Sequence, residues 1–452
     1  MDAAAQPARA ITAFDVFLAF LRQGFTAFGG PAAHLGYFRR EFVERRGWLS
    51  DAAYADLLAL CHFLPGPTSS QMGMAIGLRQ AGLAGALAAF VGFTAPAAAA
   101  MIAFALLKPR ISGTFGDGWL HGLHAAAAAV VLQAVVQMAR TLAIGPIRAG
   151  MAIGAGVGLF LIPGPAAQAA TLAAGGLFGL ALLRDTPATT TQSDAAQTVD
   201  TGSALIALGL FAGLLVGLPL LANLLQNPGL GMASVFYRTG ALVFGGDHVV
   251  LPLLEREVVD RRWLDPQTFL AGYGAVQALP GPLFNFAGYV GAAQRYGPGG
   301  IAGGLIALFS IYLPSLLLVT GVLPFWDRLK REGWARGVVA GIGATVVGVL
   351  AATLWIPVLM IAVRQPADWA LVIAAFVFLQ VAKLPAWVIV PGFALATGVF
   401  LRSEAQAVTV LDALGVHSAG SLGQRKVQSD GRCGIQLSMA ASRISAGPSL
   451  KK

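Results

Sequence analysis

Two Pro-Gly-Pro motifs carry the residues best suited to holding an anion. Pro65-Gly66-Pro67 precedes Thr68, Ser69, Ser70 and Gln71, and Pro280-Gly281-Pro282 precedes Asn285. Proline ends one helix and suits the first turn of the next, so each motif predicts a helix start. Backbone amides and the helix dipole favour anions at such a start, and the neutral side chains add donors. The alternative is a loop corner without a ligand, which two copies of the motif make less favourable.

Two Phe-Gly-Gly turns are expected beside the same site, and their glycines are Gly29, Gly30, Gly245 and Gly246. His248 follows the second pair and His34 the first, although not at matching positions. A histidine there could titrate near neutral pH and so bind or release a proton, or it could simply be hydrogen-bonded within the fold. Asp56 and Asp247 are weaker candidates, because neither recurs in the other copy of the motifs.

Arg79 and Arg295 follow the motif glycines at nearly equal spacing, and each lies beside a glutamine. Arginine in an apolar run costs about 2.5 to 3.5 kcal/mol, so it usually faces a cavity or an interface. As fork-shaped donors, both could pair with an oxyanion. The equally weighted alternative places them at helix ends, with their side chains reaching the lipid headgroups.

The other basic residues are expected to have simpler roles. The pairs Arg39-Arg40, Arg45-Arg46 and Arg261-Arg262 are predicted to orient the chain and to form loop ion pairs with Glu41, Glu44 and Glu257. An electrostatic funnel toward the Gly-Gly turns is the alternative. His121 and His124 share one helical face but lack a fourth ligand, so no metal site is predicted.

The elements that position these residues must lie in a membrane. Hydrophobic residues make up 56% of the 452 residues and charged residues only 11%, too few charges to cover a soluble protein's surface. The lipid bilayer is therefore the expected solvent. The net charge of +9 is attributed to loops that orient the chain, not to nucleic-acid binding. Without a phosphate-binding loop or a hydrolase motif, we predict neither an enzyme nor an ATP-driven pump, and no cofactor.

Apolar stretches long enough to span a membrane predict an all-α polytopic fold. They are placed near 11–29, 82–107, 119–143, 144–162, 165–183, 203–222, 230–246, 297–323, 334–361, 366–381 and 385–401. Segments 52–79 and 266–295 are interrupted by the Pro-Gly-Pro motifs. Residues 184–202 read as a polar linker, and 403–452 as a disordered tail.

The chain repeats itself at a spacing of about 215 residues. Glu41 matches Glu257, Trp48 matches Trp263, and the Phe-Gly-Gly and Pro-Gly-Pro motifs recur in order. We therefore predict two homologous halves, 11–183 and 230–402, joined by the linker and a helix at 203–222. If each broken segment crosses once, the extra helix makes the halves inverted repeats, which is the favoured arrangement. If the broken segments are re-entrant hairpins that return to the same face, the number of crossings before the second half is even and the repeats are parallel.

These motifs, with Gly245-Gly246-Asp247-His248 leading into Val249-Val250-Leu251-Pro252, resemble the chromate ion transporter family in its long, two-domain form. The resemblance covers roughly 14–183 and 234–402. It implies a multi-pass protein of the bacterial plasma membrane that exports chromate, with sulfate as a chemical mimic, in a fold of duplicated antiparallel halves. A homodimer is left open.

The leading hypothesis is a secondary transporter that holds a tetrahedral oxyanion between the two broken helices. A dianion leaving an interior-negative cell gains about 4.6 kcal/mol per 100 mV, so export needs no coupled ion. The alternatives are a transporter of sulfate or another oxyanion, an anion channel or structural membrane subunit, and an enzyme acting on lipids.

Overall fold

A computed structural model describes residues 10–184, 199–244 and 246–413. Throughout these residues the regular elements are helical, which confirms the predicted all-α class. The first half contains α1 (Ala13–Thr26), α2 (Gly30–Phe38), η1 (Arg39–Arg45), α3 (Asp51–Phe63), α4 (Thr68–Phe115), α5 (Gly118–Leu142), α6 (Pro146–Leu161) and α7 (Pro165–Leu182). The predicted linking span corresponds to α8 (Thr201–Leu225).

The second half repeats this order. It contains α9 (Pro228–Leu242), η2 (Asp247–Val249), α10 (Val250–Val258), α11 (Pro266–Val276), η3 (Leu283–Asn285), α12 (Phe286–Ala293), α13 (Gly300–Val322), η4 (Leu323–Phe325), α14 (Trp326–Leu329), α15 (Gly333–Thr353), η5 (Leu354–Leu359), α16 (Met360–Ala362), α17 (Asp368–Gln380) and α18 (Ala386–Ala413). Because α18 continues to Ala413, the tail expected from residue 403 begins as helix. The linker residues 185–198 and the remaining tail, 414–452, lie outside the described residues.

The Pro-Gly-Pro segments are hairpins that return to the face from which they start. Helix α4 is interrupted at Ala81 and Gly82, so its first arm ends near Gln80. Gln80 Nε2 donates to the Trp48 carbonyl at 2.9 Å, just before α3 begins. In the second half, the Arg295 amide donates to the Trp263 carbonyl at 3.0 Å, just before α11. The expectation that each broken segment crosses the membrane once is therefore wrong.

The first apolar stretch, 11–29, does not cross either. The Phe20 ring on α1 lies 5.4 Å from Phe38 and 4.6 Å from Phe42, so α2 and η1 run back along α1 after the Phe-Gly-Gly turn. Phe42 then stacks on Trp48 at 5.1 Å, at the mouth of the Pro-Gly-Pro hairpin. Both hairpins of the first half therefore open at the same end of the molecule.

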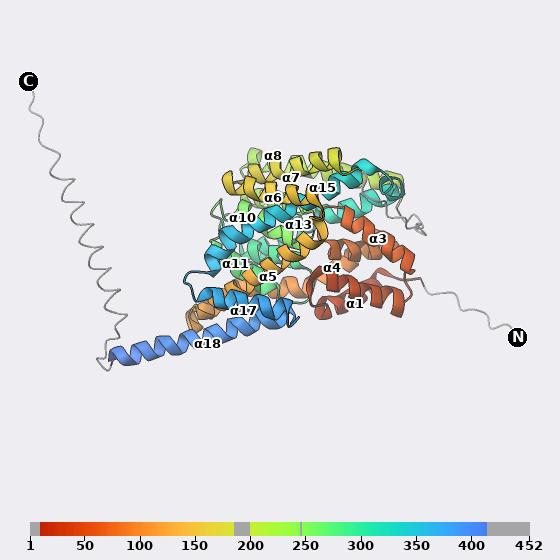
Figure 1. Cartoon of the computed structure of the whole chain (residues 1–452). Coiled ribbons are helices and arrows are strands. Elements are labelled where there is room, and N and C mark those ends of the chain that lie inside the picture. The colour runs from red at the N-terminus through yellow and green to blue at the C-terminus, as the bar shows by residue number, and fades with distance from the viewer. Residues whose placement is uncertain (1–9, 185–198, 245, 414–452) are drawn as a thin grey trace, which may run out of the picture.

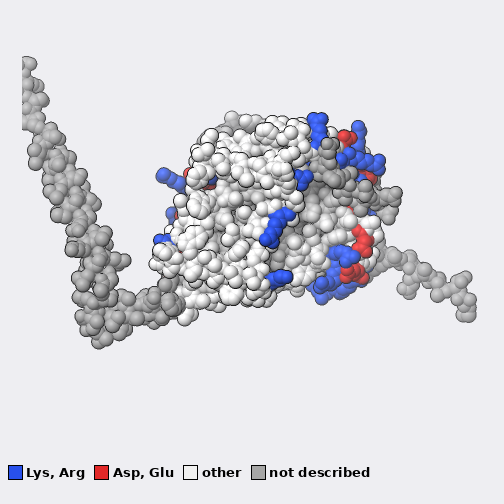
Figure 2. Space-filling model, in the orientation of Figure 1, with Lys and Arg blue, Asp and Glu red and all other residues white. Residues whose placement is uncertain are grey.

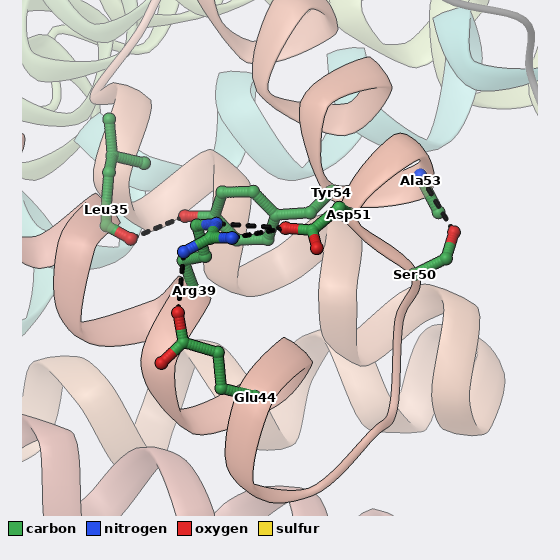
Figure 3. A network of polar contacts seen from close by, with 7 residues as sticks. All are labelled: Leu35, Arg39, Glu44, Ser50, Asp51, Ala53 and Tyr54. Carbon is green, nitrogen blue, oxygen red and sulfur yellow. Dashed lines mark hydrogen bonds and ion pairs between the residues drawn. The ribbon is translucent and has the colours of Figure 1, made fainter.

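Polar contacts hold these two hairpins together at their outer end (Figure 3). Arg39 donates to Glu44 at 2.6 Å and to Asp51 at 2.7 Å, which joins η1 to the start of α3. The Tyr54 hydroxyl donates to the Leu35 carbonyl at 2.6 Å. These contacts confirm the predicted ion pair between Arg39 and Glu44.

The remaining crossings explain why the two halves are inverted. Five segments cross before α9: the second arm of α4, α5, α6, α7 and α8. An odd number places the hairpins of the second half at the opposite end, and Figure 1 shows α3 and α11 on opposite sides of the molecule. The halves are therefore inverted for a different reason from the one expected. Each repeat contains two hairpins that do not cross the membrane, and the number of segments that cross before α9 is still odd.

The surface fits this arrangement. In the view of Figure 2, most charged side chains gather at the left and right ends, and the face between them is largely uncharged. Five described helices are long and apolar enough to cross a membrane, namely 68–114, 118–142, 201–225, 300–329 and 333–362. Helices α6, α7, α17 and α18 include shorter apolar segments, which membranes accommodate by local thinning. The protein is a multi-pass membrane protein.

The two halves are interlocked. Helix α5 packs against α17 and α18, whereas α15 packs against α6 and α7. The Gly122 amide donates to Thr397 Oγ1 at 3.0 Å, and a side chain at Gly122 would overlap the α18 backbone. Small residues permit such close approach of membrane helices. Each half therefore completes its packing with the last two helices of the other.

The inverted arrangement predicts that equivalent residues of the two halves face opposite sides of the membrane. Ala52 and Gln267 are exposed residues at the starts of α3 and α11. In a background with Cys61 and Cys433 replaced by serine, we expect Ala52→Cys and Gln267→Cys to react with a membrane-impermeant thiol reagent from opposite sides. Parallel repeats would give both cysteines the same accessibility. Both would then react in intact cells, or both would react only in inverted vesicles.

Candidate functional site

Two reciprocal backbone hydrogen bonds bring the four motifs together. The Gly66 amide donates to the Val243 carbonyl at 2.6 Å, and the Gly281 amide donates to the Ala27 carbonyl at 2.9 Å. Val243 and Ala27 each directly precede a Phe-Gly-Gly sequence. Each Pro-Gly-Pro break therefore contacts the Gly-Gly turn of the other half, and both breaks lie between the two repeats.

The first helix start is occupied by a carboxylate of the protein itself. The Thr68 amide donates to Asp247 Oδ1 at 3.1 Å, and the Ser69 hydroxyl lies 3.4 Å from Oδ2. Asp247 is completely buried, and it belongs to the other half. The amide of Thr68 and the hydroxyl of Ser69 at this helix start are therefore already engaged by the carboxyl group of Asp247. The repeat gave no indication of this contact, because the matching residue of the first half is Pro31.

The second helix start has a different environment. The position that matches Asp247 is Pro31, which carries no acid, and no side chain caps the start of η3 in the described structure. Asn285 lies at this start and is completely buried. Its Nδ2 donates to the Thr94 carbonyl at 3.3 Å, and its Oδ1 accepts from the Tyr312 hydroxyl at 3.4 Å.

Hydroxyl groups from both halves surround the two helix starts. The Tyr312 hydroxyl lies beside the hydroxyls of Ser70 and Thr94, and those two oxygens have no hydrogen-bond partner among the described residues. Gln71 Nε2 donates to the Pro65 carbonyl at 2.6 Å and lies 3.5 Å from Ser315 Oγ. All these side chains are buried. The result is an enclosed group of neutral hydrogen-bonding side chains with one carboxylate.

The Gly-Gly turns have backbone conformations that favour glycine. Gly29 and Gly30 have φ angles of 101° and 78°, and Gly246 has 133°, all unfavourable for a residue with a Cβ atom. Gly245 lies outside the described residues. His34 Nε2 lies 3.1 Å from the Ala27 carbonyl, the same oxygen that accepts from Gly281. His248 Nδ1 lies 2.7 Å from the hydroxyl of Tyr273 on α11, so His34 contacts the turn of its own half and His248 joins η2 to α11.

The arginines proposed as oxyanion ligands lie away from the breaks. Arg79 is near the outer end of the first α4 arm, about 16 Å from Thr68 by helical rise. Arg295 is exposed, at the matching end of the second hairpin. Both are near the tryptophans that mark the hairpin mouths. These positions match the alternative in which both arginines lie at helix ends, and their role as oxyanion ligands stays a prediction.

Sequence reasoning missed Thr94, Tyr312 and Ser315. Thr94 and Tyr312 each stand two residues before a proline inside a long helix, Pro96 and Pro314. This polar-x-Pro pattern recurs at a spacing close to that of the repeat, and it was a usable signal. The rest of the site follows from the Pro-Gly-Pro motifs.

Comparison with known proteins places this architecture in a family. A family model described as "Chromate transporter" matches residues 14–180 and 230–399, one match for each half. The chain belongs to the chromate transporter family. Each matched stretch contains one pair of re-entrant hairpins, so the repeat defined by the family model is also the structural repeat.

Curated members of this family resemble the chain along most of its length. The chromate transport protein of Pseudomonas aeruginosa is 30% identical over 358 residues, which cover 74% of this chain and 80% of that protein. The chromate transport protein of Cupriavidus metallidurans is 25% identical over 403 residues, or 83% and 90% of the two chains. A probable chromate transport protein of Synechococcus elongatus is 25% identical over 350 residues, or 74% of this chain and 81% of that protein. No solved structure matches the chain.

The site geometry predicts different effects for two substitutions. Asn285→Ala removes a buried amide at the open helix start, and we expect chromate binding to weaken at least about tenfold, since hydrogen bonds to charged groups contribute about 1.5 to 3 kcal/mol. Arg295→Gln, at the hairpin mouth, should leave binding within about twofold of the unmodified protein. Equilibrium binding of radiolabelled chromate to the purified proteins tests both; a large loss in Arg295→Gln with none in Asn285→Ala would contradict this site.

Proposed function

We propose that this protein is a secondary transporter that exports chromate from the bacterial cytoplasm across the plasma membrane and thereby confers chromate resistance. The observation that carries the proposal is the reciprocal docking of two Pro-Gly-Pro breaks around one buried set of neutral donors. Inverted-repeat transporters place their substrates at such breaks near the middle of the membrane. Membership of the chromate transporter family supports chromate as the substrate.

The two helix starts have unequal roles in this proposal. Asp247 already satisfies the start of α4, so an oxyanion would meet its negative charge there. The start at Leu283 has no such carboxylate, and Asn285 lies beside it. We place the oxyanion at this second start, where backbone amides, the Asn285 amide and the nearby hydroxyls can donate to its oxygens. Neutral donors hold a dianion without a fixed opposite charge that would slow its release.

The inverted repeats supply a route for alternating access. Exchanging the conformations of two inverted halves converts an inward-open protein into an outward-open one. In the described structure the donor cluster is buried, so it represents a closed state of the site. Opening would require one pair of hairpins to move away from the other half's Gly-Gly turn.

Sulfate is the second candidate substrate. Chromate and sulfate are both tetrahedral dianions, and the donors at the breaks carry no feature that selects between them. We therefore expect sulfate to compete with chromate, with the ratio of their inhibition constants giving the preference.

Export predicts a defined response to membrane voltage. In inverted plasma-membrane vesicles, we expect saturable chromate uptake that rises with an interior-positive potential and falls when sulfate is added. For uncoupled movement of a dianion, the equilibrium accumulation should change about tenfold for every 30 mV. Vesicles without the protein provide the control. Uptake that ignores voltage and follows a pH gradient would contradict uncoupled export.

Asp247 gives a second test, because its charge opposes that of the substrate. Asp247→Asn keeps an oxygen that can accept from the Thr68 amide and removes the negative charge. We expect chromate to bind at least about tenfold more tightly, with slower turnover because release is harder. Asp117→Asn, at an exposed position, is the matched control. An unchanged dissociation constant in Asp247→Asn would place the substrate away from this carboxylate.

A further inference from the structure

A second polar pocket lies away from the breaks, between α7 of the first half and α9 and α10 of the second. Its volume is about 290 Å³, enough for a four-oxygen ion and several waters, since each water occupies about 30 Å³. Three arginines and one acid contribute to its lining, Arg238, Arg256, Arg261 and Glu257. The lining therefore carries three positive charges and one negative charge, a net charge of +2.

The ion pairs in this pocket leave many donors uncommitted. Arg261 pairs with Glu257 at 2.7 Å, but Arg238 lies 3.4 Å from the same carboxylate. Arg256 approaches Glu255 and Asp260 only to 3.6 and 3.8 Å, beyond ordinary hydrogen-bond distance. A guanidinium has five N–H donors, so these contacts with acids leave further donors of Arg238 and Arg256 for a ligand.

Two buried donors in the pocket lack a partner in the described part of the chain. Gln168 is only 3% exposed, and its Nε2 has no hydrogen-bond acceptor; the Arg238 side chain is 34% exposed, but its Nε atom is buried and also lacks an acceptor. Buried donors without acceptors require an explanation, and an ion that carries acceptors supplies one. An anion with oxygens in several directions could accept from Gln168 and the arginines together.

The position of the pocket relates it to the breaks. Arg238 lies on α9, five residues before Val243, whose carbonyl accepts from Gly66 at the first break. Arg256 lies on α10, which begins directly after η2 with Asp247. Helix α10 lies toward the left end of the molecule in Figure 1, so the pocket is near the membrane face that carries the second half's hairpins.

The arrangement of charges recurs in the first half. Arg22, Arg40, Glu41 and Arg45 precede Arg238, Arg256, Glu257 and Arg261 by one constant spacing. The Arg45–Glu41 pair, at 2.8 Å, reproduces the Arg261–Glu257 pair. Inversion places these two sets at opposite ends of the molecule. A set of charges kept at both ends fits a role in collecting or releasing an ion at each membrane face.

We propose that the pocket of Arg238, Arg256, Arg261 and Gln168 is a second oxyanion site. In this vestibule a tetrahedral dianion from solution binds transiently before it moves to the breaks. The shared chemistry of such an ion and of a phospholipid headgroup is an oxygen-rich tetrahedral anion. The proposal commits to the soluble ion. It rests on the proposed function only for the identity of that ion.

The test counts bound ions. For the full-length protein in phosphatidylcholine nanodiscs, we expect radiolabelled chromate to bind at two ions per chain. The double variant Arg238→Gln/Arg256→Gln should bind one, Asn285→Ala should bind the other at least about tenfold more weakly, and Arg331→Gln, exposed elsewhere on the molecule, should retain two. In vesicles, the double variant should raise the KM for chromate about tenfold with kcat unchanged. Two bound ions and an unchanged KM in the double variant would overturn the proposal.

Two further measurements distinguish the remaining explanations. Gln168→Leu keeps every charge, so it replaces the double variant if that protein fails to fold; we expect it to weaken the second ion several-fold, and unchanged binding would overturn the site. Adding phosphatidylglycerol to the nanodiscs should leave the second chromate ion bound. Displacement of that ion by the lipid would assign the pocket to a lipid headgroup and overturn its assignment to a soluble ion. If the unmodified protein shows no chromate flux but still binds the second ion, the proposed export function is contradicted and the second anion site is not.

Discussion

The architecture depends on two backbone hydrogen bonds that cross between the halves, from Gly66 to Val243 and from Gly281 to Ala27. Backbone groups at membrane depth must be satisfied within the protein, because lipid offers no donor or acceptor. A chain that turns back halfway through the membrane exposes such groups at its tip. Each half satisfies the tip of the other, so neither half can leave its partner without losing these bonds.

That mutual satisfaction is nearly symmetric, and the departure from symmetry gives the site its chemistry. Asp247 caps one helix start, whereas Pro31 at the matching position leaves the other without a carboxylate. A duplicated fold would otherwise present two equal anion sites side by side, and two dianions there would repel each other. In the proposed site, the carboxylate of Asp247 would leave one helix start for the substrate and would oppose its tight retention.

Much of this fold was readable from the sequence, because its signals were local and came twice. Pro-Gly-Pro, Phe-Gly-Gly and the paired tryptophans defined the repeat, and the predicted spans match most of the long helices. The depth to which each segment enters the membrane was not readable, since the return of the chain along α1 through Phe38 and Phe42 is a tertiary contact. For the same reason the outer position of Arg79 did not follow from its spacing, and Asp247 has no acidic counterpart in the first half that would point to its contact with Thr68.

Helix α8 contributes little to the interior, since only 11% of its most apolar stretch is buried. Its contribution is directional: it carries the chain back across the bilayer so that the second half enters from the other side. Two separate polypeptides inserted in opposite orientations would also place the two halves correctly, without this helix. The molecule is therefore divisible at this helix, and an ancestor made of two short subunits could have assembled the same interface before the genes were joined.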